Sequence, residues 1–343
     1  MVKKSEETGQ RGAAPADRPA GRKRRRWKRW GGALLALFLA AVVGVELYAR
    51  FGLGLGDPPL YQRHETIEYL CKPGVYHRFG NVVRVNRFHM RSGPVESERR
   101  EGRSRVLVLG DSVVHGGNLT DHGELATTIL QRRLSADRGG EVFVGNVSAG
   151  SWGPANLLAY LQTFGTFDAE VVVFVLSSHD AEDVPTFRPL NPVKMPTRSP
   201  VLALQEAVGR YFVTWVKYRF GGGRADHAEQ LEAQMEGEID LRAVARCEAA
   251  LQEAILMTRE RGAEALVALH PSYLELERGD LPGKRRLART ARASGARVID
   301  LRPAYIEALR AGKDLYRDFI HLDPPGQALL AEALEQAIAE RLP

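Results

Sequence analysis

Two short motifs about 200 residues apart carry the residue types that nucleophilic acyl chemistry needs. The first, residues 106–112, is an apolar run that ends in Gly-Asp-Ser, so Ser112 directly follows a buried stretch. The second is Asp-Phe-Ile-His at residues 318–321. A serine hydroxyl becomes a good nucleophile when an imidazole takes its proton and a carboxylate holds that imidazole in the right tautomer. Ser112, His321 and Asp318 are therefore candidates for nucleophile, base and orienting acid.

Each of these residues also has an ordinary structural interpretation. Ser112 can be a helix N-cap that follows a strand, because serine commonly takes that position. Asp318 can cap a short turn, and His321 can be a surface histidine. The three taken together, in this chain order and next to predicted strands, favour the catalytic interpretation.

The chain after residue 104 has a regular rhythm of short apolar runs and longer amphipathic stretches. The short β-branched runs predict strands, and the longer stretches predict helices between them. Strands are expected at residues 105–110, 141–147, 169–176, 263–269 and 296–301, and helices at 123–136, 154–164, 231–262, 284–293 and 326–342. This alternation indicates an α/β fold with a mostly parallel sheet that is covered by helices on both faces.

Polar or glycine-rich segments follow three of these strands. They lie at residues 110–112, 146–153 and 177–180. Because sites in parallel α/β sheets lie at the carboxyl ends of the strands, we expect the three segments to meet at one edge. Asp318 and His321 precede the last helix and can reach that same edge, which is where the sequence predicts an active site.

Two other parts of the chain lack this alternation of strands and helices. Residues 52–104 are expected to form an extended lead-in with one or two strands, such as one at 82–86, and residues 105–343 to form the main domain. Residues 181–230 interrupt the main domain with a proline-rich loop and a helix expected at 201–218, which we interpret as an insertion near the site.

The N-terminus combines a basic tail with an apolar run. The chain has a net charge of +6, but residues 1–30 alone carry +8, so the remainder carries −2 and no nucleic-acid-binding face is indicated. Residues 31–51 are long enough to cross a bilayer, which needs roughly 20 residues. Trp27, Trp30 and Tyr48 flank this run, as aromatic side chains do at membrane interfaces.

The N-terminus has three alternative interpretations. A cleaved signal peptide needs a small-residue cleavage site, which the residues after the run do not offer cleanly. A nuclear-type basic cluster leaves the apolar run unexplained. An uncleaved anchor explains both features, and it predicts a single-pass protein of the inner (plasma) membrane with a cytoplasmic tail and an extracytoplasmic (periplasmic) domain.

The cysteines and histidines give no sign of a metal site. Spacing alone leaves open whether Cys71 and Cys247 are bonded, and Cys247 lies in a helical stretch where a buried thiol is common. The nine histidines are scattered, and no Cys/His cluster has zinc spacing. We therefore expect no metal and no cofactor.

The order of these motifs resembles the SGNH/GDSL hydrolases over residues 105–341. The resemblance implies a flavodoxin-like α/β/α fold that hydrolyses or transfers acyl esters. Carried over by position, it implies that Ser112 is the nucleophile, His321 the base and Asp318 its orienting carboxylate. It also implies that the Ser112 backbone N–H is the first donor of an oxyanion hole.

The resemblance is weaker for the other oxyanion donors. In the family, a glycine after the second strand gives the second N–H; here spacing selects Ser151, whereas residue identity selects Gly150. The family's third block is Gly-x-Asn-Asp, but this chain reads Ser177-Ser-His-Asp, which places His179 where the asparagine amide donates. His179 can replace that donor or mark a weakened site, since losing one donor typically costs roughly 100- to 1000-fold.

Four further residues lie near these motifs. His115 is a possible substrate contact or a surface residue, and Trp152 either packs or stacks on substrate. Asp111 is expected to shape the turn before Ser112. His270 follows a strand end and is weakly indicated at the same edge.

Anchored members of this family are often tied to O-acylation or deacylation of cell-surface polysaccharide. The resemblance thus implies a membrane-tethered serine esterase or O-acyltransferase acting on acyl (acetyl) esters of a cell-surface or exported polysaccharide. A weakened SGNH-fold subunit that binds glycan or serves assembly is the alternative, supported by the change at His179. Phosphate binding at residues 110–112 is a further possibility, but the loop lacks the lysine and glycine spacing of a P-loop.

Overall fold

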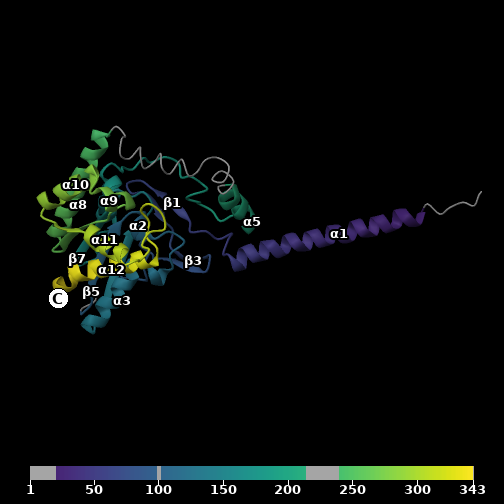
Figure 1. Cartoon of the computed structure of the whole chain (residues 1–343), viewed down its shortest axis with the longest axis horizontal. Helices are drawn as coiled ribbons and strands as arrows, with labels where there is room; N and C mark the ends of the chain where they lie inside the picture. Colours follow the sequence, from purple (N-terminus) through teal and green to yellow (C-terminus); the bar gives the residue numbers. More distant parts are fainter. Residues whose placement is uncertain (1–20, 99–101, 214–238, 343) are drawn as a thin grey trace, which may run out of the picture. The chain divides into compact units, whose positions relative to one another are not determined.

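The computed structural model describes residues 21–98, 102–213 and 239–342 of the chain. The chain divides into two units, Met1–Leu47 and Tyr48–Pro343. In the first, α1 (Gly21–Leu47) is one long helix, drawn in purple in Figure 1. Residues 29–52 form a helix of 24 residues that is long and apolar enough to span a membrane, although a signal sequence meets the same criterion. Residues 1–20 of the expected basic tail lie outside the described part.

The second unit is built on a single five-stranded parallel sheet. Its strands are β5 (Ser104–Gly110), β6 (Val142–Ser148), β7 (Val171–Leu176), β8 (Glu264–Leu269) and β9 (Arg297–Asp300). They lie in the order β6-β5-β7-β8-β9, and each neighbouring pair is parallel. This is the 2-1-3-4-5 order of flavodoxin-like folds. The predicted strands and the predicted fold class are confirmed.

Helices cover both faces of this sheet, each over its own apolar core. Along β5, Leu107 and Leu109 face one core while Val106 and Val108 face the other, because successive side chains of a strand point to opposite faces. The first core is closed by α4 (Pro154–Phe164), α8 (Leu241–Glu260) and α10 (Pro282–Ala293). The second is closed by α3 (Ala126–Arg138), α11 (Arg302–Arg310) and α12 (Pro324–Ile338). The architecture is the expected three-layer α/β/α sandwich.

The lead-in contains more strands than the sequence predicted. Two antiparallel pairs form there: β1 (Tyr61–His64) with β2 (Glu68–Cys71), and β3 (Gly74–Arg78) with β4 (Asn81–Val85). The strand expected at 82–86 corresponds to β4. The β1–β2 turn, residues 65–67, contains neither glycine nor proline, so the sequence did not mark it, and the β3–β4 turn is Phe79-Gly80, with φ of 51° and 84°. Cys71 is buried in β2, and both it and Cys247 are free thiols.

The inserted segment is described only in part. It contains the short helix α5 (Ala203–Glu206) and the π-helical turn η4 (Ala207–Phe212), while 214–218 of the helix expected at 201–218 lie outside the described residues. Likewise α8 begins at Leu241, and residues 231–238 of the helix expected there are not described. The remaining short elements are η1 (Tyr48–Gly52), α2 (Ser112–His115), η2 (His122–Glu124), η3 (Ser178–Ala181), α9 (Tyr273–Arg278) and η5 (Ala339–Arg341).

Candidate active site

Ser112 is the first residue of α2 and lies at the carboxyl end of β5. Asp111 caps this helix, because its side chain accepts a hydrogen bond from the Val113 N–H at 2.9 Å. The glycine at 110 is required by the tight turn, since a Cβ there would lie 2.5 Å from the Val114 side chain and 3.0 Å from the Val175 carbonyl. The turn therefore presents the Ser112 hydroxyl at the edge of the sheet.

Asp318 and His321 occupy a tight turn before α12. One Asp318 carboxylate oxygen accepts hydrogen bonds from the backbone N–H groups of Ile320 at 3.0 Å and His321 at 2.8 Å. The turn is closed by an antiparallel bridge between Tyr316 and Leu322. The same carboxylate thus shapes the loop and faces the imidazole.

These two elements bring Ser112, His321 and Asp318 into one hydrogen-bonded chain. The distance from Ser112 Oγ to His321 Nε2 is 2.8 Å, and from His321 Nδ1 to Asp318 Oδ2 it is also 2.8 Å. With the Nδ1 proton donated to Asp318, Nε2 is left to accept the serine proton. The His321 and Asp318 side chains are 35% and 33% exposed, so the chain is open to solvent.

Asp318 is held in its ionised form. Burial alone would raise its pKa, but the hydrogen bonds from the His321 side chain and from two backbone N–H groups bring the pKa to about 2. The carboxylate is therefore charged at any pH at which an imidazole acts as a base.

Three backbone N–H groups near Ser112 are available to a ligand. The N–H groups of Ser112, Gly150 and Ser151 donate to no acceptor within the described residues. Gly150 and Ser151 lie in the loop after β6, and Ser151 has a φ of 57°, in the left-handed region. Free N–H groups of this kind can bind a developing oxyanion.

His179 lies at the end of β7, in η3, and its imidazole faces carboxylates. Its Nε2 is 3.0 Å from Asp111 Oδ2 and 3.5 Å from Asp180 Oδ1. The side chain of His179 is 27% exposed, while those of Asp111 and Asp180 are 2% and 0% exposed. Since Nε2 is engaged in this way, only Nδ1 is left to donate to a substrate.

Asp180 and Asp111 both raise the pKa of the His179 imidazole. Burial alone would lower its pKa, but the charge of Asp180 and the hydrogen bond and charge of Asp111 raise it to about 10. For Asp111, burial would raise the pKa, but the hydrogen bond and charge of His179 lower it. For Asp180, burial outweighs His179, and the pKa lies well above its usual value.

By distance alone, this group could hold a metal ion. One ligand atom each from Asp111, His179 and Asp180 lies within 4.8 Å of the others. This group was not predicted from the sequence, because His179 and Asp111 are 68 positions apart. A protonated His179 places one positive charge beside the Asp111 carboxylate.

The remaining predicted residues are buried. His115 is 5% exposed, and burial followed by the charge of Arg91 lowers its pKa to about 3. Trp152 is 1% exposed and packs between Tyr69 and Tyr160. Neither side chain is accessible to a substrate, so we do not propose a substrate contact at His115 or Trp152.

His270 supports the loop that carries His321. It is fully buried, and its Nε2 lies 3.0 Å from the Ile320 carbonyl. Gln327, which the sequence did not single out, plays a similar part on the other side of Ser112. Its side chain donates to the Val113 carbonyl at 3.1 Å and accepts from the Ala126 N–H at 2.8 Å. No sequence motif marks Gln327, and its role becomes visible only from its full burial in the structure.

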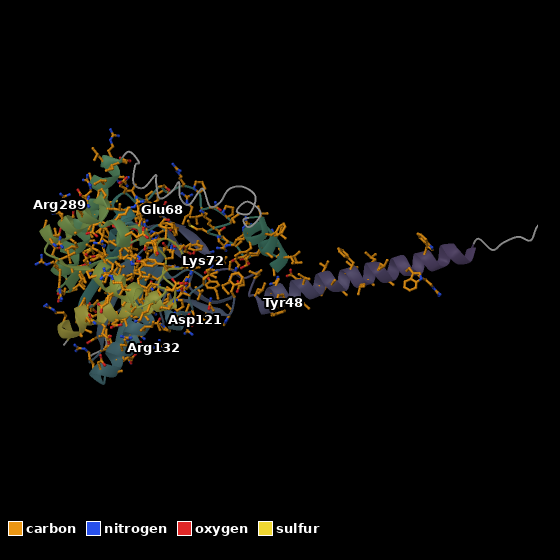
Figure 2. All side chains as sticks on the ribbon, in the orientation of Figure 1. Tyr48, Glu68, Lys72, Asp121, Arg132 and Arg289 are labelled. Atoms are coloured by element: carbon orange, nitrogen blue, oxygen red, sulfur yellow. The ribbon has the colours of Figure 1, made fainter. Side chains whose placement is uncertain are left out.

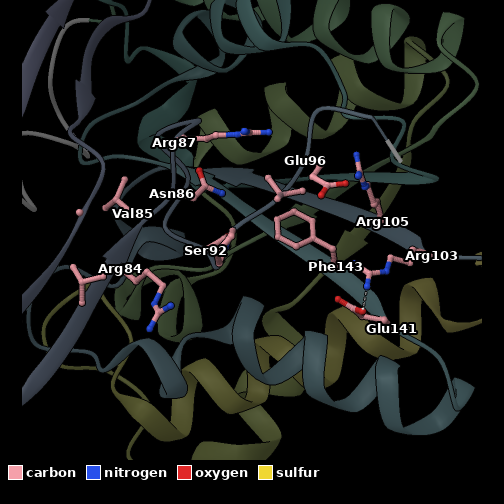
Figure 3. A pocket seen from close by; sticks show the side chains of 14 residues that line it. Arg84, Val85, Asn86, Arg87, Ser92, Glu96, Arg103, Arg105, Glu141 and Phe143 are labelled. Atoms are coloured by element: carbon pink, nitrogen blue, oxygen red, sulfur yellow. Dashed lines mark ion pairs between the residues drawn. The ribbon is translucent and has the colours of Figure 1, made fainter. Parts of the chain in front are cut away.

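A separate cavity of about 470 Å³ lies away from these residues (Figure 3). It is lined by β3, β4 and the starts of β5 and β6, and includes Arg105 and Phe143. On its wall Arg103 forms an ion pair with Glu141 at 2.6 Å, drawn as a dashed line in Figure 3. Since β5 carries Arg105 at its amino end and Ser112 follows its carboxyl end, this cavity is distinct from the triad.

No protein-family model and no curated protein sequence matches this chain. Among solved structures it is similar to LAE5, an alpha/beta hydrolase enzyme from the metagenome of Lake Arreo, with 17% identity, 68% of this chain and 94% of that chain covered, and a TM-score of 0.43. It is similar to Axe2, an acetylxylan esterase from Geobacillus stearothermophilus, with 17% identity, 70% and 96% covered, and a TM-score of 0.42.

A third similar structure is a member of the lipolytic protein G-D-S-L family from Veillonella parvula. It shares 13% identity, with 68% of this chain and 97% of that chain covered, at a TM-score of 0.41. Likeness at this level does not transfer an activity, a substrate or a residue's role from one protein to another.

Proposed function

We propose that this chain is a serine-dependent ester hydrolase of the SGNH/GDSL type. The observation that carries the proposal is the unbroken chain of hydrogen bonds from Ser112 through His321 to Asp318. Two of its residues come from a single turn, and the third comes from a strand end more than 200 positions earlier. Such an arrangement activates a serine for attack on a carbonyl carbon.

In the proposed reaction, Ser112 Oγ attacks the ester carbonyl while His321 Nε2 takes the hydroxyl proton. The bond between the carbonyl carbon and the alcohol oxygen then breaks, and His321 returns the proton to the leaving alcohol. A water molecule, deprotonated by His321, attacks the acyl-enzyme and releases the acid and Ser112. Asp318 stays ionised throughout and stabilises the imidazolium.

The oxyanion of the intermediate is proposed to bind at the free backbone N–H groups. Ser112 supplies one, and the loop after β6 supplies another from Gly150 or Ser151. His179 is proposed as a third donor through Nδ1, in the place of an asparagine amide. A protonated imidazole donates a stronger hydrogen bond to an anion than a neutral amide does.

Two further proposals concern the location of the protein and its substrate. We infer that the apolar helix anchors the chain in a membrane, with the basic residues in the cytoplasm and the domain after Tyr48 on the extracytoplasmic side. The basic cluster directly before the apolar run supports this orientation. The substrate that suits this location is an acyl ester of a surface polysaccharide, and a sugar hydroxyl can replace water as the acceptor.

A weakened, glycan-binding subunit is the second candidate function. The observation that favours it is the orientation of His179, whose Nε2 is engaged with Asp111. If Nδ1 does not face the oxyanion, the site has lost one donor, and binding without efficient turnover results.

A fluorophosphonate probe tests the proposal in the purified full-length chain. We expect covalent labelling of the wild type, no labelling of Ser112→Ala, and undiminished labelling of Ser199→Ala, a control at an exposed serine. Hydrolysis of 4-nitrophenyl acetate should follow the same pattern. Equal labelling of the Ser112→Ala variant would rule out the serine mechanism, and labelling without hydrolysis would favour the subunit function.

A further inference from the structure

Residues 201–213 of the inserted segment pack Ala203, Ala207 and Tyr211 inward but expose a second set of apolar side chains. Its outward side chains include Val201, Leu202, Val208, Phe212 and Val213, which are 84%, 51%, 52%, 57% and 41% exposed. A surface helix normally buries such residues and exposes its charges. Here these five apolar side chains form an exposed apolar face instead.

The charged side chains of the same segment point inward. Glu206 is 5% exposed at its side chain and forms an ion pair with Arg78, whose side chain is fully buried. Glu206 also accepts a hydrogen bond from the Gly56 N–H at 2.7 Å, and Arg78 donates to the Tyr211 hydroxyl at 3.0 Å. These bonds fix the segment to the lead-in, so its apolar face is held outward by specific contacts.

The segment packs against η1, the first element of the second unit. Ala203 and Ala49 are buried in one small apolar cluster with Leu55. The side chain of Arg50 donates to the Val201 carbonyl at 2.9 Å. The exposed apolar face therefore begins beside η1.

The element η1 itself carries two exposed aromatic side chains. Tyr48, labelled in Figure 2, and Phe51 are 65% and 79% exposed. The 24-residue span that ends at Gly52 is about 36 Å long as a helix, which exceeds a hydrocarbon core of about 30 Å. Its last residues consequently reach the headgroup layer, where tyrosine and other aromatic side chains are favoured.

We propose that the outward face of residues 201–213, together with Tyr48 and Phe51, is a membrane-docking surface that inserts into the lipid interface on the domain's side. This proposal depends on the proposed membrane anchor. Because the surface is covalently continuous with the apolar span, we take lipid as the molecule that covers it. Val201, Val208 and Phe212 enter the boundary between headgroups and acyl chains, as the apolar face of an interfacial helix does. Docking fixes the orientation of the domain toward the membrane.

Depth-dependent fluorescence quenching tests this surface in the full-length chain. The variants Phe212→Cys and Val201→Cys are labelled with a small fluorophore and reconstituted into phosphatidylcholine–phosphatidylglycerol vesicles that carry a quencher near the headgroups. Leu256→Cys on α8, where the side chain is 39% exposed, is the matched control. Unsubstituted protein gives the background, because both native thiols are buried. Val201 precedes α5, so this variant leaves the short helix unchanged.

We expect at least about twofold more quenching at positions 212 and 201 than at 256. If the protein floats with the vesicles but quenching is equal at all three positions, the docking surface is wrong and the membrane anchor is supported. Failure to float would overturn the anchor and the surface together. If the label at position 212 becomes more shielded as the protein concentration rises in detergent, the surface binds a second copy of the chain and the docking proposal is wrong. Ester hydrolysis in detergent reports on Ser112 independently of all these outcomes.

Discussion

Two histidine–carboxylate groups lie beside Ser112, and they differ in burial. His321 and its partner Asp318 are each about one-third exposed, and His321 Nε2 faces the serine hydroxyl. His179 faces Asp111 and Asp180, which are almost completely buried. The residue types are the same, so their surroundings must set what each group can do.

The comparison shows why only one of the two histidines suits general-base catalysis. A general base must take a proton from the nucleophile, and His321 Nε2 is placed for this at 2.8 Å from the Ser112 hydroxyl. At His179, two buried carboxylates raise the pKa to about 10, so the ring keeps its proton. An imidazole that keeps its proton at neutral pH can donate a hydrogen bond and offset the charge of Asp111, but it cannot accept the Ser112 proton.

The largest expected effect comes from removing the exposed histidine or its serine. His321→Ala and Ser112→Ala should each lower kcat for 4-nitrophenyl acetate on the order of 10⁵-fold or more, because triad members act as a unit. The double variant should be no slower than either single variant. His77→Ala, at an exposed histidine of the lead-in, should keep wild-type kinetics. Multiplying losses in the double variant would show that the two residues do not share one mechanism.

A smaller loss is expected when the carboxylate of the same group is neutralised. Asp318→Asn should lower kcat on the order of 10⁴-fold, because an amide can donate to Nδ1 and then favours the wrong tautomer of His321. Asp314→Asn, an exposed position in the preceding loop, is the control and should have no effect. Steady-state kinetics of both variants measure the difference. Near-normal activity of Asp318→Asn would mean that the carboxylate only shapes the turn.

The buried group should matter less for the chemical step. His179→Ala should lower kcat about 100-fold with little change in KM, since an oxyanion donor acts mainly in the transition state. His179→Asn should recover much of that loss, because its amide can donate from the same place. Full activity of His179→Ala would rule out an oxyanion role and leave the residue a structural one.

The difference between the two groups also separates what the sequence could and could not predict. Ser112 and Asp318 were found because each belongs to a short motif whose meaning is local: a strand that ends in a turn, and a turn before a helix. The contact of His179 with Asp111 depends on β5 and β7 being neighbours in the sheet. Strand order is set by packing of the whole domain, and hydrophobic periodicity does not report it.

The same reasoning applies to the outward-facing apolar segment. The sequence indicated a helix near residue 201, but it did not indicate which face of that helix would be buried. The orientation is fixed by the pairing of Glu206 with Arg78, which lies 128 positions earlier. Periodicity locates an amphipathic element, and only tertiary contacts decide which side of it meets the core.

The smallest expected effect is a difference in how stability depends on pH. The pKa of His179 rises from 6.5 to about 10 on folding, so the stabilisation from its charge is fully present below pH 6.5 and is lost as the pH rises toward 10. The pKa of Asp318 falls from 3.8 to about 2, so its stabilisation is present above pH 3.8 and is lost only in acid.

Urea unfolding at several pH values between 6.5 and 10 measures this difference. The wild type should lose more free energy of unfolding across this range than His179→Asn, which has no titrating ring at this position. The buried thiols of Cys71 and Cys247, whose pKa values burial raises to about 12, contribute to both proteins and cancel in the comparison. Asp318→Asn should follow the wild-type curve here, because its carboxylate is ionised whether the chain is folded or unfolded. Parallel curves for the wild type and His179→Asn would show that His179 is not charged in the folded protein, and the contrast between the two histidines would then fail.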